Sequence, residues 1–231
     1  MFYLKKYVKP YTGMILLSII LLFARANLDL ALPDYLSRIV NVGIQQGGVD
    51  SALPVAIRQT QMERTWIFMN SSEQADIDAA YSLINENSSE YQTNLEKYPI
   101  LVNESIYIQK NLPSDREAEL ELLMAENLLI VFTIERIMEN ETLIDEMGVS
   151  LGFNISALPE GMDVFTVIAG LPEESQNAIA EEIIESFSTL GESMLIQGGI
   201  TAVRAEYDAL GMDTDKIQMN YIYRSGTLML A

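Results

Sequence analysis

The hydrophobic positions of the chain form one long run near its start and a series of shorter helical patterns after it. Residues 11–32 are dominated by apolar side chains, most densely at Met14–Ala24. A helix of these 22 residues is roughly 33 Å long at about 1.5 Å per residue, enough to cross a bilayer with some tilt. The pattern therefore predicts a first transmembrane helix, preceded by Pro10 and capped by Thr12.

The second half of this predicted helix carries the polar residues Arg25, Asn27 and Asp29. Arg25 and Asp29 are four positions apart, so they share a helix face and can form an ion pair. A charge at the bilayer centre costs about 2.5–3.5 kcal/mol, but these residues lie past the midpoint, where long side chains reach the interface more easily. Two interpretations stay open: a pair that satisfies itself near the outer interface, or side chains that line a cavity inside a helix bundle.

Beyond Pro33 the sequence predicts a domain that is nearly all α. A helical period runs through Tyr35–Ile44 and stops at Gln45-Gln-Gly-Gly48. The segment Ile100–Ile108 fits either a strand or a helix. Further helices are predicted from Pro54 to about Asn70, from Glu73 (capped by Ser72) to about Ile84, from Ser114 to about Glu139, after Pro159, after Pro172 as far as Gly191, and over about Ser193–Leu210.

Two of these predicted helices have informative apolar patterns. The helix after Ser114 begins with a capping-box sequence, Ser114-Asp-Arg-Glu117, and is apolar on all sides at Leu128–Phe132. Charged residues lie close to this centre on both sides, which favours a buried core helix over a second membrane span. In the helix after Pro172, Ile179, Ile183 and Phe187 line one face.

A second membrane-directed helix is predicted from Asp213 onward. Ile217, Tyr221, Ser225 and Met229 fall along one helical face, and an apolar run begins at Leu228. We expect this segment to be the start of a second transmembrane helix in a longer polypeptide. The predicted class is therefore all-α, with a cytoplasmic stub, first transmembrane helix and outward extension at 1–45, an acidic helical domain at 46–212, and the second helix at 213–231.

The distribution of charge predicts which side of the membrane each segment occupies. Residues 1–45 carry five Lys and Arg against two Asp, whereas the rest of the chain carries nine Lys and Arg against 31 Asp and Glu. Basic residues beside an apolar helix stay in the cytoplasm, and long acidic domains cross the membrane regardless of charge. The prediction is a cell-membrane protein with a cytoplasmic N-terminus and residues 46–212 extracellular. The net charge of −19 argues against a nucleic-acid partner.

Several kinds of chemistry are excluded by composition. The chain has no cysteine and no histidine, so thiol catalysis, zinc–thiolate sites, histidine bases and histidine metal ligands are impossible. No catalytic, cofactor-binding or metal-ligating residue is predicted. Asp213-Thr-Asp215 lacks the oxygen cage that calcium needs and is interpreted as a helix cap. Five Asn-x-Ser/Thr triplets are interpreted as chance matches rather than glycan sites, at Asn70, Asn87, Asn103, Asn140 and Asn154.

A cleaved signal peptide is an alternative to the first membrane helix. Lys5, Lys6 and Lys9 would be its basic region, Met14–Phe23 its apolar core and Ala24-Arg-Ala26 its cleavage site. Cleavage after Ala26 would release a secreted acidic binding module. The apolar pattern continues past Ala26, which favours the permanent anchor.

Two segments resemble one protein family. Pro10-Tyr11, the apolar helix and Leu30–Gly48 (LALPDYLSRIVNVGIQQGG) are similar to the start of bacterial ABC multidrug exporters, in particular the Gram-positive half-transporters that commonly form heterodimers. Gly211–Gly226 (GMDTDKIQMNYIYRSG) resembles the start of their second transmembrane helix. The two segments cover about a quarter of the chain, and the roughly 160 residues between them replace a loop that is short in many exporters.

The resemblance implies a function for the longer polypeptide. It implies a six-helix permease followed by an ATP-binding domain that uses ATP and Mg²⁺, pairs with a second half-transporter as a hetero- or homodimer, and exports drugs, lipids or peptides. No Walker A motif occurs in this chain, so no residue is assigned to nucleotide, and the fragment itself is not expected to be an enzyme. Arg25, Asn27 and Asp29 would line the translocation pathway, and Pro33–Gly43 would extend the first helix outward.

A two-span membrane receptor fits the same topology. In that alternative the residues between the helices form an extracellular sensing domain, and a signalling module follows the second helix. The reading frame after Ala231 distinguishes the two, because an exporter requires four more spans and a Walker A motif.

Overall fold

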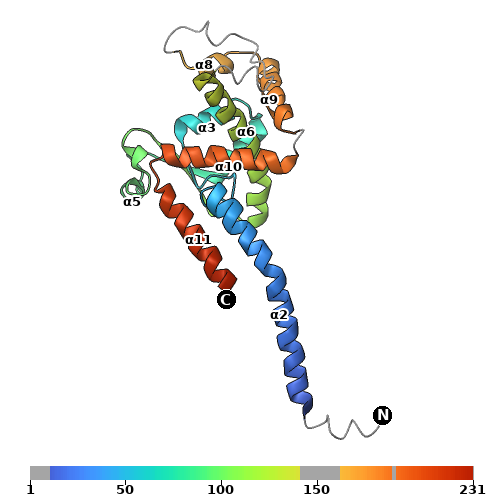
Figure 1. The fold of residues 1–231 in the computed structure, drawn as a ribbon. Helices are drawn as coiled ribbons and strands as arrows, with labels where there is room; N and C mark the ends of the chain where they lie inside the picture. Colours follow the sequence, from blue (N-terminus) through green and yellow to red (C-terminus); the bar gives the residue numbers. More distant parts are fainter. Residues whose placement is uncertain (1–10, 141–161, 189–190, 231) are drawn as a thin grey trace. The chain divides into compact units, whose positions relative to one another are not determined.

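The computed structural model describes residues 11–140, 162–188 and 191–230. Of these residues 73% are helical and 6% lie in strands, which confirms the predicted all-α class. The chain divides into two compact units (Figure 1). The first contains the residues up to Gly48 together with those from Lys216 onward, and the second contains Val49–Asp215.

The first unit is built on one long helix. Helix α2 (Thr12–Arg38) continues without a break into the π-helix η2 (Ile39–Gln45). Pro33 lies inside α2 and does not end it, so the predicted helical continuation beyond this proline is confirmed. The turn after η2 is closed by backbone hydrogen bonds from Gln46 N to Asn41 O at 3.0 Å and from Gly48 N to Val42 O at 2.8 Å. Helix α11 (Thr214–Leu230) supplies the rest of the unit.

A small antiparallel sheet in the second unit corrects two helix predictions. Strands β1 (Ala56–Arg58), β2 (Tyr81–Ile84) and β3 (Ile106–Gln109) pair in the order β1-β3-β2. The helices predicted from Pro54 to Asn70 and from Glu73 to Ile84 were therefore wrong over β1 and β2. Tyr107 of β3 lies opposite Ile57 on one side and Leu83 on the other. Pairing with this central strand overrides the local helical period.

Short helices connect these strands. They are α3 (Gln59–Trp66), α4 (Ser71–Ala80), α5 (Tyr91–Leu95) and the 3₁₀ helix η3 (Pro99–Val102). The cap of α4 is Asn70 rather than the predicted Ser72, because Asn70 Oδ1 accepts hydrogen bonds from the N–H groups of Ser72 and Glu73 at 2.9 and 3.1 Å. Glu73 Oε2 accepts one in return from Asn70 N at 2.8 Å, which completes a capping box.

Helix α6 (Ser114–Glu139) is the centre of the second unit, and its predicted start, end and burial are confirmed. Leu128–Val131 are buried on all sides of the helix, as an all-round apolar pattern requires. Pro113 occupies the N-cap position without a side-chain bond, so the predicted cap by Ser114 was wrong. Helices α8 (Val164–Ala169), α9 (Glu173–Ser188) and α10 (Glu192–Ala209) pack around α6.

The apolar core joins α6, α8 and α9. Its buried members are aliphatic side chains and one phenylalanine: Ile130, Val131, Ile134, Ile137, Val164, Phe165, Ile168, Ile179 and Ile183. Ile179 and Ile183 are buried and Phe187 packs against them, so the face predicted for the helix after Pro172 is confirmed. Helix α10 ends near Gly211, whose φ is 75°, as predicted. The helix start predicted at Pro159 lies outside the described residues.

Helices α6 and α10 approach closely at a pair of glycines. A Cβ at Gly199 would lie 2.6 Å from Ala125 Cα, and one at Gly198 would lie 2.8 Å from Leu129 Cδ1. Ala125 Cα is a backbone atom and cannot rotate away. A side chain at Gly199 would therefore push the two helices apart.

We expect Gly199→Ala to destabilise the second unit by about 1–3 kcal/mol, because overpacking outweighs the gain in helix propensity. The measurement is urea unfolding of the full chain in detergent, followed by the fluorescence of Trp66, the only tryptophan. Gly170→Ala is the matched control, since its Cβ would meet an ordinary contact of 3.4 Å. Equal stabilities of the two variants would contradict close packing of α6 on α10.

Candidate functional site

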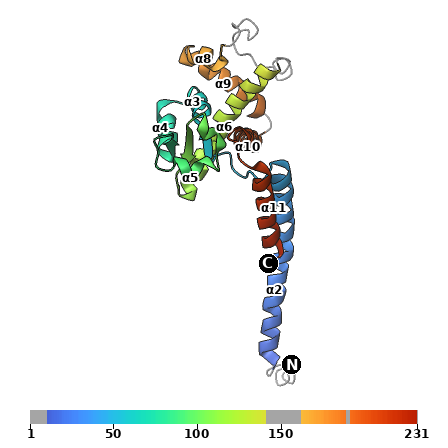
Figure 2. The same cartoon turned by 90° about the vertical axis from the view of Figure 1, so that its left-hand side faces the viewer.

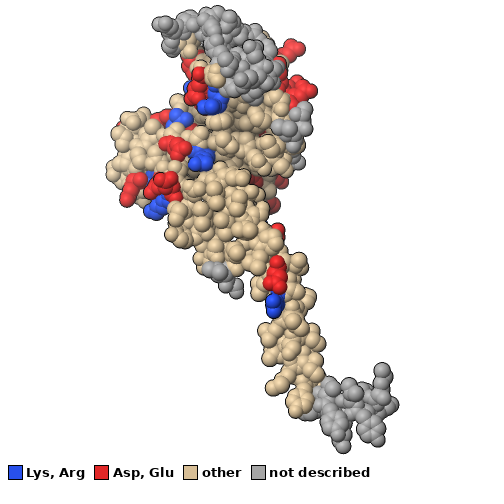
Figure 3. Space-filling view, viewed as in Figure 1, with Lys and Arg blue, Asp and Glu red and all other residues tan. Residues whose placement is uncertain are grey.

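Helix α2 has the length and surface of a membrane-spanning helix. The continuous helix Thr12–Gln45 has a mean hydropathy of 2.0 in its most apolar window, and no part of that window is buried. Met14 and Phe23 are 70% and 72% exposed, and at about 100° per residue they lie on opposite sides of the helix. Among the described residues it is the one helix that is long and apolar enough to cross a membrane. Figure 3 shows its visible face as mostly uncharged.

The three candidate pathway residues of α2 are only partly brought together. Arg25 Nε lies 3.6 Å from Asp29 Oδ2, with the two side chains 78% and 63% exposed, so the predicted ion pair is confirmed. Asn27 Nδ2 instead donates to the carbonyl of Phe23 on its own helix at 2.7 Å. At about 100° per residue, Asn27 is on the opposite side of α2 from Arg25. A role for any of the three in a translocation pathway stays a prediction.

Helix α11 returns beside the end of α2 in the opposite direction, as Figure 2 shows. Gly43 is buried, and a Cβ added there would lie 2.8 Å from Ile222 Cγ1. Gly48, at a φ of +82°, would place a Cβ 2.8 Å from Gln218 Cα. From Gly48 back to Gly43 in η2, the contact moves forward along α11 from Gln218 to Ile222, which defines an antiparallel pair.

A hydrogen bond joins this helix pair at the π-helix. Gln218 Nε2 donates to the carbonyl oxygen of Gly43 at 2.8 Å and lies 3.5 Å from that of Ile44. A helix end leaves carbonyl groups without intrahelical partners, and the amide of α11 satisfies one of them. The sequence did not reveal this role of Gln218. The glycines at 43, 47 and 48 were the available signal, because they permit close approach and a positive φ.

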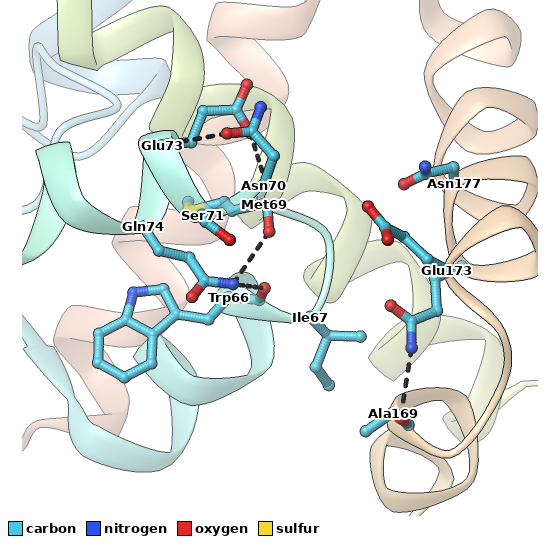
Figure 4. A pocket seen from close by; sticks show the side chains of 11 residues that line it. Trp66, Ile67, Met69, Asn70, Ser71, Glu73, Gln74, Ala169, Glu173 and Asn177 are labelled. Carbon is cyan, nitrogen blue, oxygen red and sulfur yellow. Dashed lines mark hydrogen bonds between the residues drawn. The ribbon is translucent and has the colours of Figure 1, made fainter.

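The second unit contains a cleft of about 600 Å³ between α3, α4 and the start of α9 (Figure 4). One wall carries Trp66, Ile67 and Met69 together with the capping box of α4. Figure 4 shows Glu173 and Asn177 pointing from α9 toward that wall. Sequence reasoning missed this cleft, because its walls come from segments about 100 residues apart that no local pattern connects.

Each wall of the cleft contains a turn between two helices, which we call a corner. The first corner joins α3 to α4, the second joins α8 to α9, and the same hydrogen bonds hold both. At the first, Gln74 Nε2 donates to the carbonyls of Trp66 and Met69, both at 3.0 Å. At the second, Gln176 Nε2 donates to the carbonyls of Ile168 and Leu171 at 3.2 and 3.0 Å. All three positions of the second corner are 102 residues after those of the first. Each glutamine closes the end of one helix from the first turn of the next.

The backbone of the two corners repeats as well. Met69 N donates to Trp66 O at 3.2 Å, and Leu171 N donates to Ile168 O at 3.0 Å. The first helical bond of the following helix runs from Gln74 N to Asn70 O at 2.9 Å in one corner and from Gln176 N to Pro172 O at 3.2 Å in the other. Because carbonyl groups at both corners are satisfied internally, the cleft walls are formed before anything occupies the space between them.

Buried charges beside the sheet are paired. Glu206 is 2% exposed and accepts hydrogen bonds from Arg58 Nε at 3.0 Å, Nη2 at 2.7 Å and backbone N at 2.7 Å. Burial raises the pKa of Glu206, and the guanidinium opposes that rise. Burial lowers the pKa of Arg58, but its hydrogen bond and attraction to Glu206 reverse this and leave the pKa raised. The pair fixes β1 to α10.

A second ion-pair cluster lies next to the apolar core. Arg64 Nη1 is 2.7 Å from Glu135 Oε1, its Nη2 is 3.1 Å from Asp163 Oδ1, and its guanidinium lies 4.4 Å from the centre of the Phe165 ring. These contacts tie α3, α6 and the start of α8 together. The cluster pairs one arginine with two carboxylates and so keeps one negative charge, and its contacts give it a structural role.

The minor motifs of the sequence have structural settings. Among the described residues, no three His, Cys, Asp or Glu side chains gather as metal ligands. Asp213 immediately precedes α11, the position of the predicted cap. Asn70 uses its side chain to cap α4, and Asn87, Asn103 and Asn140 are exposed. Asn154 lies outside the described residues.

Comparison with known proteins adds no assignment. No protein-family profile matches the chain, and no curated protein or solved structure is significantly similar to it.

The helix pair predicts a specific crosslink in this cysteine-free chain. In Gly43→Cys/Ile222→Cys, the Cβ of residue 43 would lie 2.8 Å from the Cγ1 position of Ile222, which suits a disulfide. We expect rapid intramolecular oxidation, measured in membranes by gel mobility with and without reductant. Gly43→Cys/Tyr223→Cys is the control, because Tyr223 is 66% exposed. Similar yields from both pairs would contradict the antiparallel packing.

The buried Arg58–Glu206 pair predicts that replacing Arg58 lowers the unfolding free energy much more than replacing an exposed arginine. Arg58→Met leaves Glu206 buried without its partner and is expected to cost about 3–5 kcal/mol of unfolding free energy. Arg136→Met removes an exposed pair with Glu139 and is expected to cost less than about 1 kcal/mol. Urea unfolding followed by Trp66 fluorescence compares them. A loss below about 1 kcal/mol for Arg58→Met would refute the structural role of the pair.

Proposed function

We propose that the chain is the N-terminal membrane region of an ATP-driven exporter half-transporter of the ABC class. Helix α2 would be its first transmembrane helix, α11 would begin the second, and Val49–Asp215 would form an extracellular domain between them. The similarity of Leu30–Gly48 and Gly211–Gly226 to the corresponding exporter segments supports this assignment. The ATP-binding domain and a second half-transporter would complete the machine.

The observation that carries the proposal is the exposed Arg25–Asp29 ion pair in a helix that is mostly apolar from Met14 to Leu32. Arg25 lies 13 residues after the start of α2, roughly 20 Å along a hydrocarbon layer of about 30 Å. Arg25 and Asp29 are 78% and 63% exposed, and charged groups at such depth are unfavourable against lipid. Other helices of a bundle would cover them. A multispan transporter provides such helices, whereas a simple anchor does not.

Charge supports the proposed orientation. Three lysines precede α2, while the second unit contains 31 of the 33 acidic residues of the chain. Cytoplasmic retention of the basic end leaves the second unit on the outer side. A cysteine-free sequence is compatible with an outer domain that relies on its apolar core rather than on disulfides.

A two-span receptor is the second candidate function, and the preformed cleft of the second unit favours it. A sensing domain needs a ligand site with stable walls, and the two glutamine-capped corners supply such walls. Receptor and exporter differ in their output. Measurement of ATP-dependent efflux from cells that express the full-length gene separates the two, since a receptor would produce none.

The exporter proposal predicts the effect of exchanging the two charges on α2. In Arg25→Asp/Asp29→Arg the ion pair and the net charge are kept while each position changes sign. If these side chains face the translocation pathway, the ratio of cationic to anionic substrate efflux changes by about tenfold, equivalent to about 1.4 kcal/mol. Transport assays in inside-out vesicles of the full-length protein with its partner measure this ratio.

A matched variant distinguishes pathway charges from a pair that only neutralises itself. Arg25→Gln/Asp29→Asn removes both charges and lowers the insertion cost of the helix. If substrate ratios in the exchange variant and the neutral variant both equal those of the native protein, Arg25 and Asp29 do not contact the pathway. Equal amounts of each variant in the membrane are the control for folding.

A further inference from the structure

We propose that the outer edge of strand β2 is a docking site for an extended, lysine-containing peptide, which would add a fourth strand to the sheet. This inference concerns the second unit alone and does not depend on whether the full-length protein is an exporter or a receptor. It follows from the unpaired backbone of this edge, the groove beside it, and the charge of the unit.

The register of the sheet leaves part of the β2 backbone unpaired. Lys110 N donates to Ala80 O at 2.8 Å, and in an antiparallel pair every second residue exchanges hydrogen bonds with its partner. The backbone groups of Tyr81 and Leu83 therefore point away from β3. Tyr81 N bonds instead to Asp78 O. The groups that remain on the outer edge are Tyr81 O, Leu83 N and Leu83 O.

These edge groups are accessible and lie in the order that an added strand requires. No other described residue forms a hydrogen bond with them, and Leu83 is 40% exposed. The edge ends at a turn in which Ser88 N donates to Asn85 O at 2.9 Å. A peptide residue opposite Leu83 would form two hydrogen bonds with it, and Tyr81 O would accept a third.

A groove of about 210 Å³ beside β2 gives the added strand a preferred side-chain pattern. Its lining includes Ser82 and Ile84 of β2 and the carboxylate-bearing Glu90. Because side chains alternate along a strand, Ser82 and Ile84 lie on the opposite face of the sheet from Leu83. A bound peptide would therefore place every second side chain beside Leu83 and the others toward the groove. Valine suits the first set and lysine the second.

The charges near the edge favour a basic partner. Glu90 lines the groove, and Asp78 and Glu86, which flank β2 in the chain, are both exposed. Lys110 is the one base among the described residues of the groove lining, and its Nζ already donates to Ala79 O at 2.9 Å. The carboxylates at this edge therefore outnumber the cations.

The charge of the whole unit acts in the same direction. Val49–Asp215 contains 31 acidic residues and 7 Lys and Arg, a net charge of −24. A field of this sign attracts a cationic segment and repels an anionic one. Pairing of β2 with β2 of a second copy would bring two such charges together, so a basic peptide is the favoured occupant.

The test is a titration of the full 231-residue chain in phosphatidylcholine nanodiscs with the blocked peptide Val-Lys-Val-Lys-Val-Lys-Val. Isothermal titration calorimetry is expected to show saturable binding of one peptide per chain. The same peptide with glutamate in place of each lysine is expected not to bind. Equal heats with empty nanodiscs, or equal affinity for the two peptides, would overturn the proposal.

Backbone methylation of the peptide tests the register without changing the protein. Methyl groups on the valine nitrogens block the peptide edge that would face Leu83, and are expected to weaken binding at least about tenfold. Methyl groups on the lysine nitrogens point away from β2 and are expected to change affinity less than about twofold. Equal affinity of the two methylated peptides would mean that charge alone attracts them, which contradicts strand addition.

A proline variant removes the donor on the protein side. Leu83→Pro eliminates the outward N–H but no hydrogen bond to β3, and proline is accepted on edge strands in this orientation. We expect peptide affinity to fall at least about tenfold, whereas Leu83→Thr, which keeps the N–H, stays within about threefold. Undiminished affinity in Leu83→Pro, with an unchanged circular dichroism spectrum, would refute the site. If that spectrum changes, the methylated peptides decide the question.

Charge variants locate the lysine side chains. Glu90→Gln is expected to weaken binding about three- to five-fold. Glu86→Gln is the matched control, because Glu86 is exposed and outside the groove lining, and less than a twofold effect is expected. Equal effects would show that only the general field of the unit acts. A dimer in detergent that Leu83→Pro abolishes, without peptide binding to the native chain, would assign the edge to a second copy and overturn the proposal.

Discussion

The proposed function depends on one physical constraint. The apolar surface of helix α2 is not covered by other described parts of the protein. Helix α2 exposes large hydrophobic side chains on all sides over a length that exceeds a bilayer's hydrocarbon layer. Water is an unfavourable surrounding for such a surface. Lipid would suit most of this surface but not the Arg25–Asp29 pair, which neighbouring helices would cover in the proposed exporter. Its geometry thereby favours a multispan assembly over a simple tether.

The sequence predicted most of the helical framework, because that information is local. The period of α6, the start of α9 after Pro172 and the end of α10 near Gly211 were all readable from spacing and helix-terminating residues. The ion pair on α2 was predictable for the same reason, since Arg25 and Asp29 are one helical turn apart. The resemblance to exporters stays a hypothesis about the two membrane segments.

The features that the sequence did not predict depend on partners far away in the chain. Strands β1 and β2 form because each finds an edge of β3, and the local helical pattern at Pro54–Arg58 gives no sign of that partner. Gln218 caps a carbonyl 175 residues earlier. The cleft combines residues near position 70 with residues near position 175. The spacing of apolar residues along the chain does not reveal contacts between distant segments. The matching positions of Gln74 and Gln176 were a signal in the sequence that the two corners are alike.

The self-contained hydrogen bonding of the two glutamine-capped corners has a consequence for how this protein can change over evolutionary time. Each corner completes the backbone of its own bend, so neither needs the other to keep its shape. The chain that joins them forms β2, β3 and α6, so the two bends share one core although their hydrogen bonds are separate. Side chains that line the cleft can therefore be exchanged while the backbone of both bends keeps its shape.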